Sequence, residues 1–121
     1  MTCVPSIVAT VTSTGLSQNT SQTVDLYTPS ASGLFRVSVF AVAPTSQSAV
    51  LAAFHLNWTD ESGSRALQLG TPQGSCFGNP GSGDPVGSTS FIHALADDIY
   101  LTIDSNSGGP NYNVYAIVET F

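Results

Sequence analysis

The sequence predicts an all-β protein: an antiparallel sandwich of two sheets with about eight strands, wired like a jelly roll. Apolar and polar residues alternate with a period of two in most apolar runs, which is typical of strands with one buried face. Clusters of glycine, proline, serine and asparagine interrupt these runs, so none is long enough to suggest a helix. The length of 121 residues corresponds to a single domain spanning 1–121.

An immunoglobulin-like wiring is the competing arrangement for a sandwich of this size. Immunoglobulin domains carry an internal pair of cysteines on either side of a buried tryptophan. In this chain Cys3 precedes the first expected strand and Cys76 lies in an expected loop. The sequence therefore favours the jelly-roll wiring.

The first two expected strands lie ahead of the longest apolar block. Residues 6–13 alternate aliphatic side chains with threonine, and residues 23–27 follow a polar loop. A turn cluster at 28–33, which contains Pro29 and Gly33, then leads into the third strand.

The longest apolar block has two arms, 33–43 and 49–58, separated by Pro44 and its polar neighbours. Both arms are rich in β-branched and aromatic residues, which indicates strands. Both also carry apolar residues on their two faces, whereas a strand with a solvated outer face would show polar residues there.

The surplus apolar side chains predict a contact surface, because each sheet of a sandwich gives only one face to the core. A patch of this size exceeds what a soluble monomer normally exposes. We therefore expect self-association as a closed ring, with a trimer favoured, or else as a lattice or filament. The predicted interface residues are Phe40, Val42, Leu51, Ala53, Tyr115 and Ile117.

The second half of the chain continues the strand pattern around one irregular segment. Residues 59–64 are expected to form a hairpin turn. Residues 70–88 hold six of the eleven glycines and are expected to form a long loop rich in glycine and proline. The remaining strands are expected at 65–69, 89–95, 99–104 and 111–119.

The two cysteines allow two interpretations. The simpler one is two free thiols, since disulfides are rare in the cytosol. The other is a Cys3–Cys76 disulfide that ties the N-terminus to the long loop, which would stabilise the fold by about 4 kcal/mol in the chain-entropy model. No histidine has zinc-site spacing to either cysteine, so we expect no metal site there.

The composition argues against several classes of partner and location. Charged residues make up 8% of the chain, lysine is absent, and the formal net charge is −6. Nucleic-acid binding and attraction to anionic membranes need clustered cations, so neither is expected. We also expect no signal peptide and no membrane-spanning segment. The uncharged polar surface is typical of adhesins, pilins and virion proteins, which places the chain in a virion or outside the cell.

No catalytic constellation is visible in the sequence, and no enzyme activity or cofactor is expected. His55 and His93 both lie within apolar strands, where a packed, hydrogen-bonded structural role is favoured. No glycine-flanked serine forms a nucleophile elbow. The acidic pairs 60–61 and 97–98 lie in turns, which favours solvated carboxylates over a calcium site.

Four short motifs follow one another along the chain: Leu26–Pro29, Gly33–Val39, Leu56–Asp60 and Tyr112–Phe121. Together they resemble a recurrent module of small tailed-phage and metagenomic virion proteins. They cover most of the chain from Leu26 onwards, without the loop at 70–88. The resemblance implies a β-sandwich virion component that is oligomeric and has no enzymatic role.

Two functions are therefore considered. The first is a structural subunit of a virion or a similar extracellular assembly, as a capsid decoration, head-fibre or tail-tip module that contacts itself and other virion proteins. The alternative is a carbohydrate-binding sandwich that recognises surface glycans. The aromatic residues that would contact a sugar are Trp58, Tyr100, Tyr112 and Tyr115, for which core packing or a subunit interface is the competing interpretation.

Overall fold

The computed structural model describes residues 5–42, 54–69, 86–105 and 111–121. Within these ranges the chain forms eight strands and no helix, which confirms the all-β prediction. No helix in this part of the chain is long and apolar enough to cross a membrane. The strands are β1 (Ser6–Leu16), β2 (Gln22–Tyr27), β3 (Gly33–Val42), β4 (Phe54–Asp60), β5 (Gly63–Leu69), β6 (Val86–Ala94), β7 (Ile99–Ile103) and β8 (Tyr112–Thr120).

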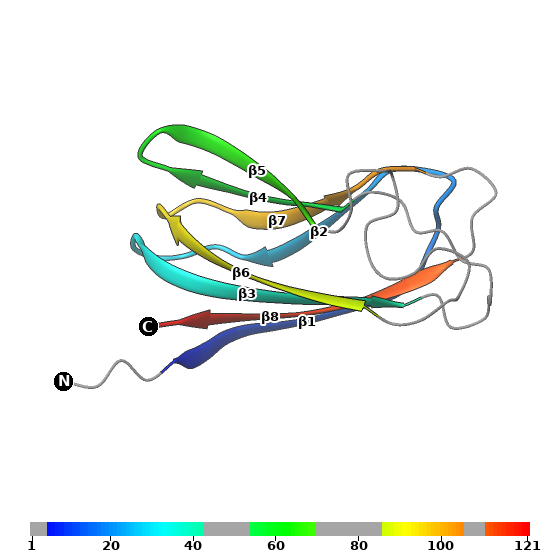
Figure 1. The fold of residues 1–121 in the computed structure, drawn as a ribbon, viewed down its shortest axis with the longest axis horizontal. Helices are drawn as coiled ribbons and strands as arrows, with labels where there is room; N and C mark the ends of the chain where they lie inside the picture. The colour runs from blue at the N-terminus through cyan, green and yellow to red at the C-terminus, as the bar shows by residue number, and fades with distance from the viewer. Residues whose placement is uncertain (1–4, 43–53, 70–85, 106–110) are drawn as a thin grey trace.

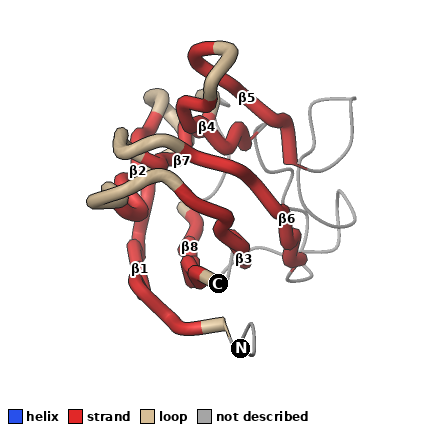
Figure 2. The backbone as a smooth tube through the Cα atoms, turned by 90° about the vertical axis from the view of Figure 1, so that its left-hand side faces the viewer, coloured by secondary structure: helices blue, strands red, loops and turns tan. Residues whose placement is uncertain are grey.

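The strands form two antiparallel sheets of four that face each other as two layers (Figures 1 and 2). Sheet A has the order β1-β8-β3-β6, and sheet B has the order β2-β7-β4-β5. The first strand thus pairs with the last, the second with the seventh, the third with the sixth and the fourth with the fifth. This is a long hairpin rolled up on itself, which is the wiring of a jelly roll.

The core lies between the two sheets and follows the period-two pattern of the sequence. In β3 the side chains of Phe35, Val37, Val39 and Ala41 are buried, as the alternation predicts. The central strands of sheet B contribute fully buried aliphatic residues such as Leu101. The other buried apolar residues are Val24, Leu26, Phe54, Leu56, Leu69, Ile92, Ala94, Ile99, Ile103, Tyr112, Val114, Ala116 and Val118.

Several predicted boundaries differ from the structure: β1 continues to Leu16, beyond the predicted 6–13, and two further differences have a clear local cause. The β4–β5 turn is shorter than the predicted hairpin at 59–64, because Asp60 accepts a hydrogen bond from the Ser62 backbone N–H at 2.8 Å and Gly63 supplies a φ of 108°. The predicted loop at 70–88 is also too long at its end, because β6 begins at Val86. A β-ladder joins backbone groups, so this glycine- and serine-rich start of β6 can pair with the end of β3.

Both cysteines lie outside the described residues, and the Cys3–Cys76 disulfide stays a prediction. The positions of the neighbouring strands set the distance that the chain must span to form this bond. Ser6 lies opposite Thr120 at one end of sheet A. Val86 and Val114 both lie opposite Ala41. Val114 comes six residues before Thr120 on β8, so Val86 lies roughly 20 Å along the sheet from Ser6. The ten residues from Cys76 to Val86 reach about 33 Å when extended, so the chain is long enough for the bond.

Candidate functional site

The outer face of sheet A, called the apolar face below, carries most of the exposed hydrophobic side chains. Among the described residues, eight large hydrophobic residues are exposed, and seven of them belong to this face. The eighth, Leu67, lies on β5 in sheet B. The seven residues of the apolar face are Ile7, Leu34, Phe40, Phe91, Tyr115, Ile117 and Phe121.

Strand pairing brings these residues together from distant parts of the sequence. On β3 and β8, Phe40 lies opposite Tyr115, and their ring centroids are 6.0 Å apart. One row further along, Ile117 lies opposite Ser38, which in turn lies opposite Thr89 on β6. Directly opposed residues in a sheet point to the same side, so these side chains form one continuous surface.

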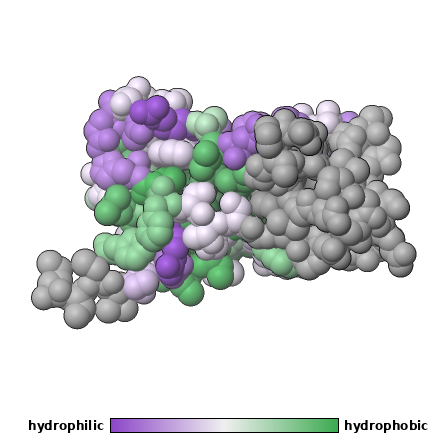
Figure 3. All heavy atoms as spheres, in the orientation of Figure 1, coloured by the Kyte–Doolittle hydropathy of each residue, from purple (hydrophilic) through white to green (hydrophobic). Residues whose placement is uncertain are grey.

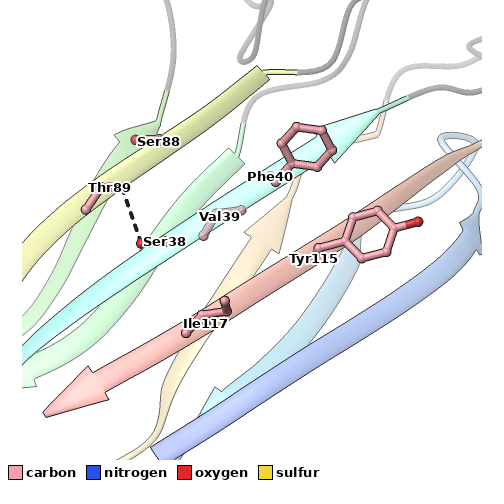
Figure 4. A pocket seen from close by; sticks show the side chains of 7 residues that line it. All are labelled: Ser38, Val39, Phe40, Ser88, Thr89, Tyr115 and Ile117. Atoms are coloured by element: carbon pink, nitrogen blue, oxygen red, sulfur yellow. Dashed lines mark hydrogen bonds between the residues drawn. The ribbon is translucent and has the colours of Figure 1, made fainter. Parts of the chain in front are cut away.

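A groove of about 300 Å³ lies on the apolar face (Figure 4). Bulky side chains form its walls, with Phe40 on β3 and Tyr115 and Ile117 on β8. The groove exists because small residues stand between them on β3 and β6. The Ser38 and Thr89 hydroxyls are 3.3 Å apart and hydrogen-bonded to each other. Ser88 and Val39 complete the lining.

An ion pair lies on the same face, beside the groove. Arg36 donates two hydrogen bonds to the Glu119 carboxylate, at 2.8 and 2.9 Å. The guanidinium carbon also lies 6.0 Å from the Phe91 ring centroid and 5.8 Å from that of Phe121. The two rings stack on each other, with centroids 5.5 Å apart.

The pairing of Arg36 with Glu119 keeps the centre of the apolar face electrically neutral. The hydrogen bonds from Arg36 hold the pKa of the Glu119 carboxyl below its ordinary range, and those same bonds raise the pKa of Arg36. Both groups therefore stay charged and paired at neutral pH.

The outer face of sheet B is polar by contrast. Its central strands carry Asn57 and Thr102, whose side chains are joined by a hydrogen bond from Asn57 Nδ2 to Thr102 Oγ1 at 3.0 Å. In the space-filling view, hydrophilic residues gather over the β4–β5 hairpin at the top, and hydrophobic residues are more frequent below, towards sheet A (Figure 3). The outward residues of sheet B include Thr23, Asp25, His55, Asn57, Thr59, Ala66, Gln68, Tyr100 and Thr102.

Of the predicted interface residues, the structure places Phe40, Tyr115 and Ile117 side by side on the apolar face. Val42 is half-buried at the end of β3, opposite Asn113. Leu51 and Ala53 lie outside the described residues. The strand that follows them, β4, belongs to sheet B, so the outer positions of β3 and β4 face in opposite directions.

Four members of the apolar face were missed by the sequence prediction. Ile7, Leu34, Phe91 and Phe121 lie on or beside four different strands. Each looks like an isolated apolar residue in its own run, because their proximity depends on strand order. The one signal within the sequence is that Phe91 shares a strand face with His93, because histidine is fully buried less often than aliphatic residues are.

The aromatic residues considered for sugar binding do not converge. Tyr112 is 1% exposed and packs in the core against Phe54, so the idea that it presents its ring to a ligand is wrong. Trp58 packs partly against the core. Tyr100 lies on the outer face of sheet B, and Tyr115 lies on the apolar face of sheet A.

The ionisable groups form local pairs. His93 Nδ1 lies 2.9 Å from Glu61 Oε1, which agrees with the predicted partnered histidine, but its side chain is 40% exposed and so is less packed than predicted. Asp60 accepts hydrogen bonds from the Ser62 backbone and from Arg65, and the first of these lowers its pKa most. Within the described residues, no three histidine, cysteine, aspartate or glutamate side chains are placed to hold a metal ion.

No protein-family model matches this chain, and no curated protein sequence does either. Solved structures show a likeness of fold. One is the globular domain of zebrafish complement 1qA protein, with 15% identity and a TM-score of 0.56 over 93% of this chain and 94% of that one. Another is the PRD1 vertex protein, with 11% identity and a TM-score of 0.54 over 96% of this chain and 99% of that one. The chain thus has the sandwich fold of both proteins over nearly its whole length.

Proposed function

We propose that this chain is a non-enzymatic structural subunit of a virion or a similar extracellular assembly, and that it associates with copies of itself through the apolar face. A closed trimer is the favoured form, and a capsid decoration, head-fibre or tail-tip module is the favoured role. The observation that carries the proposal is the asymmetry of the sandwich. Seven exposed large hydrophobic residues lie on one outer face, while the opposite outer face is polar.

The exposed area on the apolar face is of the right size for a subunit contact. The seven side chains are between 37% and 66% exposed. With about 150–200 Å² for each whole side chain, they leave on the order of 600 Å² of apolar surface in water. A standard interface buries about 800 Å² per partner. At about 25 cal/mol per Å², covering 600 Å² contributes about 15 kcal/mol per face, which offsets an association cost of roughly 4–15 kcal/mol.

The distribution of charge favours a second copy of this chain as the partner that covers the apolar face. The chain has a formal net charge of −6, so two copies repel each other over most approaches. The apolar face is different, because its central carboxylate, Glu119, is neutralised by Arg36 at 2.8 Å. Two copies can therefore bring these faces together without opposing like charges.

The virion assignment draws on the fold as well as on the resemblance in the sequence. The PRD1 vertex protein, which shares the fold over 96% of this chain, is by its name a component of a virus particle. The globular domain of zebrafish complement 1qA protein, which shares the fold over 93% of this chain, is by its name part of a complement protein.

Carbohydrate binding is the second candidate, and one row on sheet B favours it. Asp25 lies opposite Tyr100, which lies opposite Asn57. A carboxylate, a phenol ring and an amide in one row can combine ring stacking with hydrogen bonds to sugar hydroxyls. Replacing Tyr100 by alanine should abolish binding on a glycan array if this row is a sugar site.

The solution mass tests the main proposal. We expect light scattering and native mass spectrometry to give three times the chain mass of 12.5 kDa. A chain that remains monomeric at about 100 μM, well above the Kd expected for a stable interface, would overturn the proposal. Immunogold electron microscopy of particles from the native source tests the virion assignment separately.

A further inference from the structure

We infer that the groove on the apolar face receives the Phe91 ring of a neighbouring copy, so that each subunit carries both a projecting ring and a socket. This inference rests on the proposed self-association, and it names the contact that orients one subunit against the next.

The groove suits one aromatic side chain. Its volume is about 300 Å³. A cavity of about 150 Å³ already accommodates a benzene ring, and small-molecule sites start at about 300 Å³. The walls are apolar, from Phe40, Tyr115 and Ile117. The floor hydroxyls of Ser38 and Thr89 bond to each other, so an incoming ring covers a hydroxyl pair that already has a partner.

Phe91 is the residue that projects from the same face. At 66% it has the highest exposed fraction among the exposed large hydrophobic residues of the described chain. It follows Thr89 by two positions on β6, so it points to the same side about 7 Å further along the strand.

Other side chains hold the Phe91 ring in its projecting position. Phe121 stacks on it at 5.5 Å, and the Arg36 guanidinium lies over it at 6.0 Å. Glu119 fixes that guanidinium through two hydrogen bonds. The ring is thus kept beside its own groove, and less side-chain entropy is lost when it enters the groove of another copy.

The placement of the two features suits another copy of this chain as the molecule whose ring enters the groove. The ring and the groove lie at different places on one face, so the ring of one subunit can enter the groove of the next while its own groove stays open to a third. A contact of this kind is heterologous and closes into a ring when the rotation allows it. The proposed trimer has this form.

A mixing experiment tests the inference. Phe91→Ala removes the ring and keeps the groove, while Ser38→Phe fills the groove and keeps the ring. Each variant alone should associate at least about 30-fold more weakly than the parent, as expected for the loss of a central contact residue. Mixed in equal amounts, they should form heterodimers in native mass spectrometry, because Phe91 of one variant still fits the open groove of the other.

Matched variants separate this inference from the broader proposal. Leu34→Ala removes a side chain that is 55% exposed on the same face but belongs to neither feature, and it should weaken association much less than Phe91→Ala does. Thr89→Phe is a second way to fill the groove if Ser38→Phe does not fold, as judged by circular dichroism.

Three results would overturn the inference while leaving self-association intact. The first is an assembled parent with a Phe91→Ala variant that associates equally well. The second is a Leu34→Ala variant weakened as much as Phe91→Ala, which would indicate unspecific burial. The third is benzene binding to the Phe91→Ala variant without any heterodimer on mixing, which would assign the groove to a small ligand. A monomeric parent would instead overturn the proposed function itself.

Discussion

Replacing Ile117 by aspartate should convert the assembly into folded monomers. Ile117 lies on β8, the second strand of sheet A, and its outward side chain is 37% exposed. Its neighbours across the sheet are Thr10 and Ser38. In a monomer the new carboxylate would meet hydroxyl groups and water, so we expect a loss of only about 1–2 kcal/mol in the free energy of unfolding.

In the assembly, Ile117→Asp lowers the free energy of association by more than it lowers the stability of the monomer. Burying the exposed third of the isoleucine side chain contributes about 1.5 kcal/mol per contact, which the variant loses. A carboxylate taken out of water without a partner adds a penalty of several kcal/mol. A total of about 3–5 kcal/mol raises the Kd by roughly 10²- to 4 × 10³-fold per contact.

Light scattering over a concentration series measures the change in Kd, and far-ultraviolet circular dichroism checks that the β spectrum is retained. Ala66→Asp is the matched control. It adds the same charge at an exposed outward position on β5, on the polar face of the sandwich, and should leave the assembly unchanged. An Ile117→Asp variant that stays assembled, or an Ala66→Asp variant that dissociates as readily, would refute the assignment of the interface to sheet A.

Three further predictions concern the core, the ion pair and the cysteines. Leu101→Ala should lower the free energy of unfolding by about 2–5 kcal/mol in a denaturant titration, because this side chain is fully buried on a central strand; a loss below about 1 kcal/mol would mean that the core repacks. Glu119→Gln should lower the melting temperature above about pH 5, and the difference should vanish as the pH falls through the lowered pKa of Glu119, because protonation removes the same pairing with Arg36; a gap that persists at pH 2 would contradict this. Intact mass after alkylation should show protected thiols at Cys3 and Cys76 until a reductant is added, and two alkylated thiols in unreduced protein would exclude the disulfide.

The strands and their buried sides could be predicted because period-two alternation is a local property. In β3, Phe35 to Ala41 alternate clearly, and the side with the aromatic and β-branched residues faces the core. The wiring followed from the number of strands and their turns. β8 was harder, since Tyr112 and Tyr115 put large apolar groups on both of its faces and the pattern alone does not say which side is buried.

The composition of the apolar face could be predicted only in part, because register between distant strands is not encoded locally. Phe40 and Tyr115 stood out as surplus apolar residues within their own strands. Phe91 and Phe121 did not, since their significance depends on Arg36 lying between the strands that carry them. The groove depends in the same way on small residues of β3 and β6 meeting in one row.

The place of β8 in sheet A also has a consequence for how the chain folds. β8 leaves the ribosome after the other seven strands, yet it lies between β1 and β3. Until residues 112–120 are available, both of those strands keep an open hydrogen-bonding edge. Pairing Ser6 with Thr120 closes a loop over nearly the whole chain, and such long-range contacts form slowly. The unfinished sheet therefore has a gap between β1 and β3 that one strand can fill. If β8 of the same chain fills this gap, the domain is complete. If β8 of another copy fills it, a domain-swapped aggregate forms.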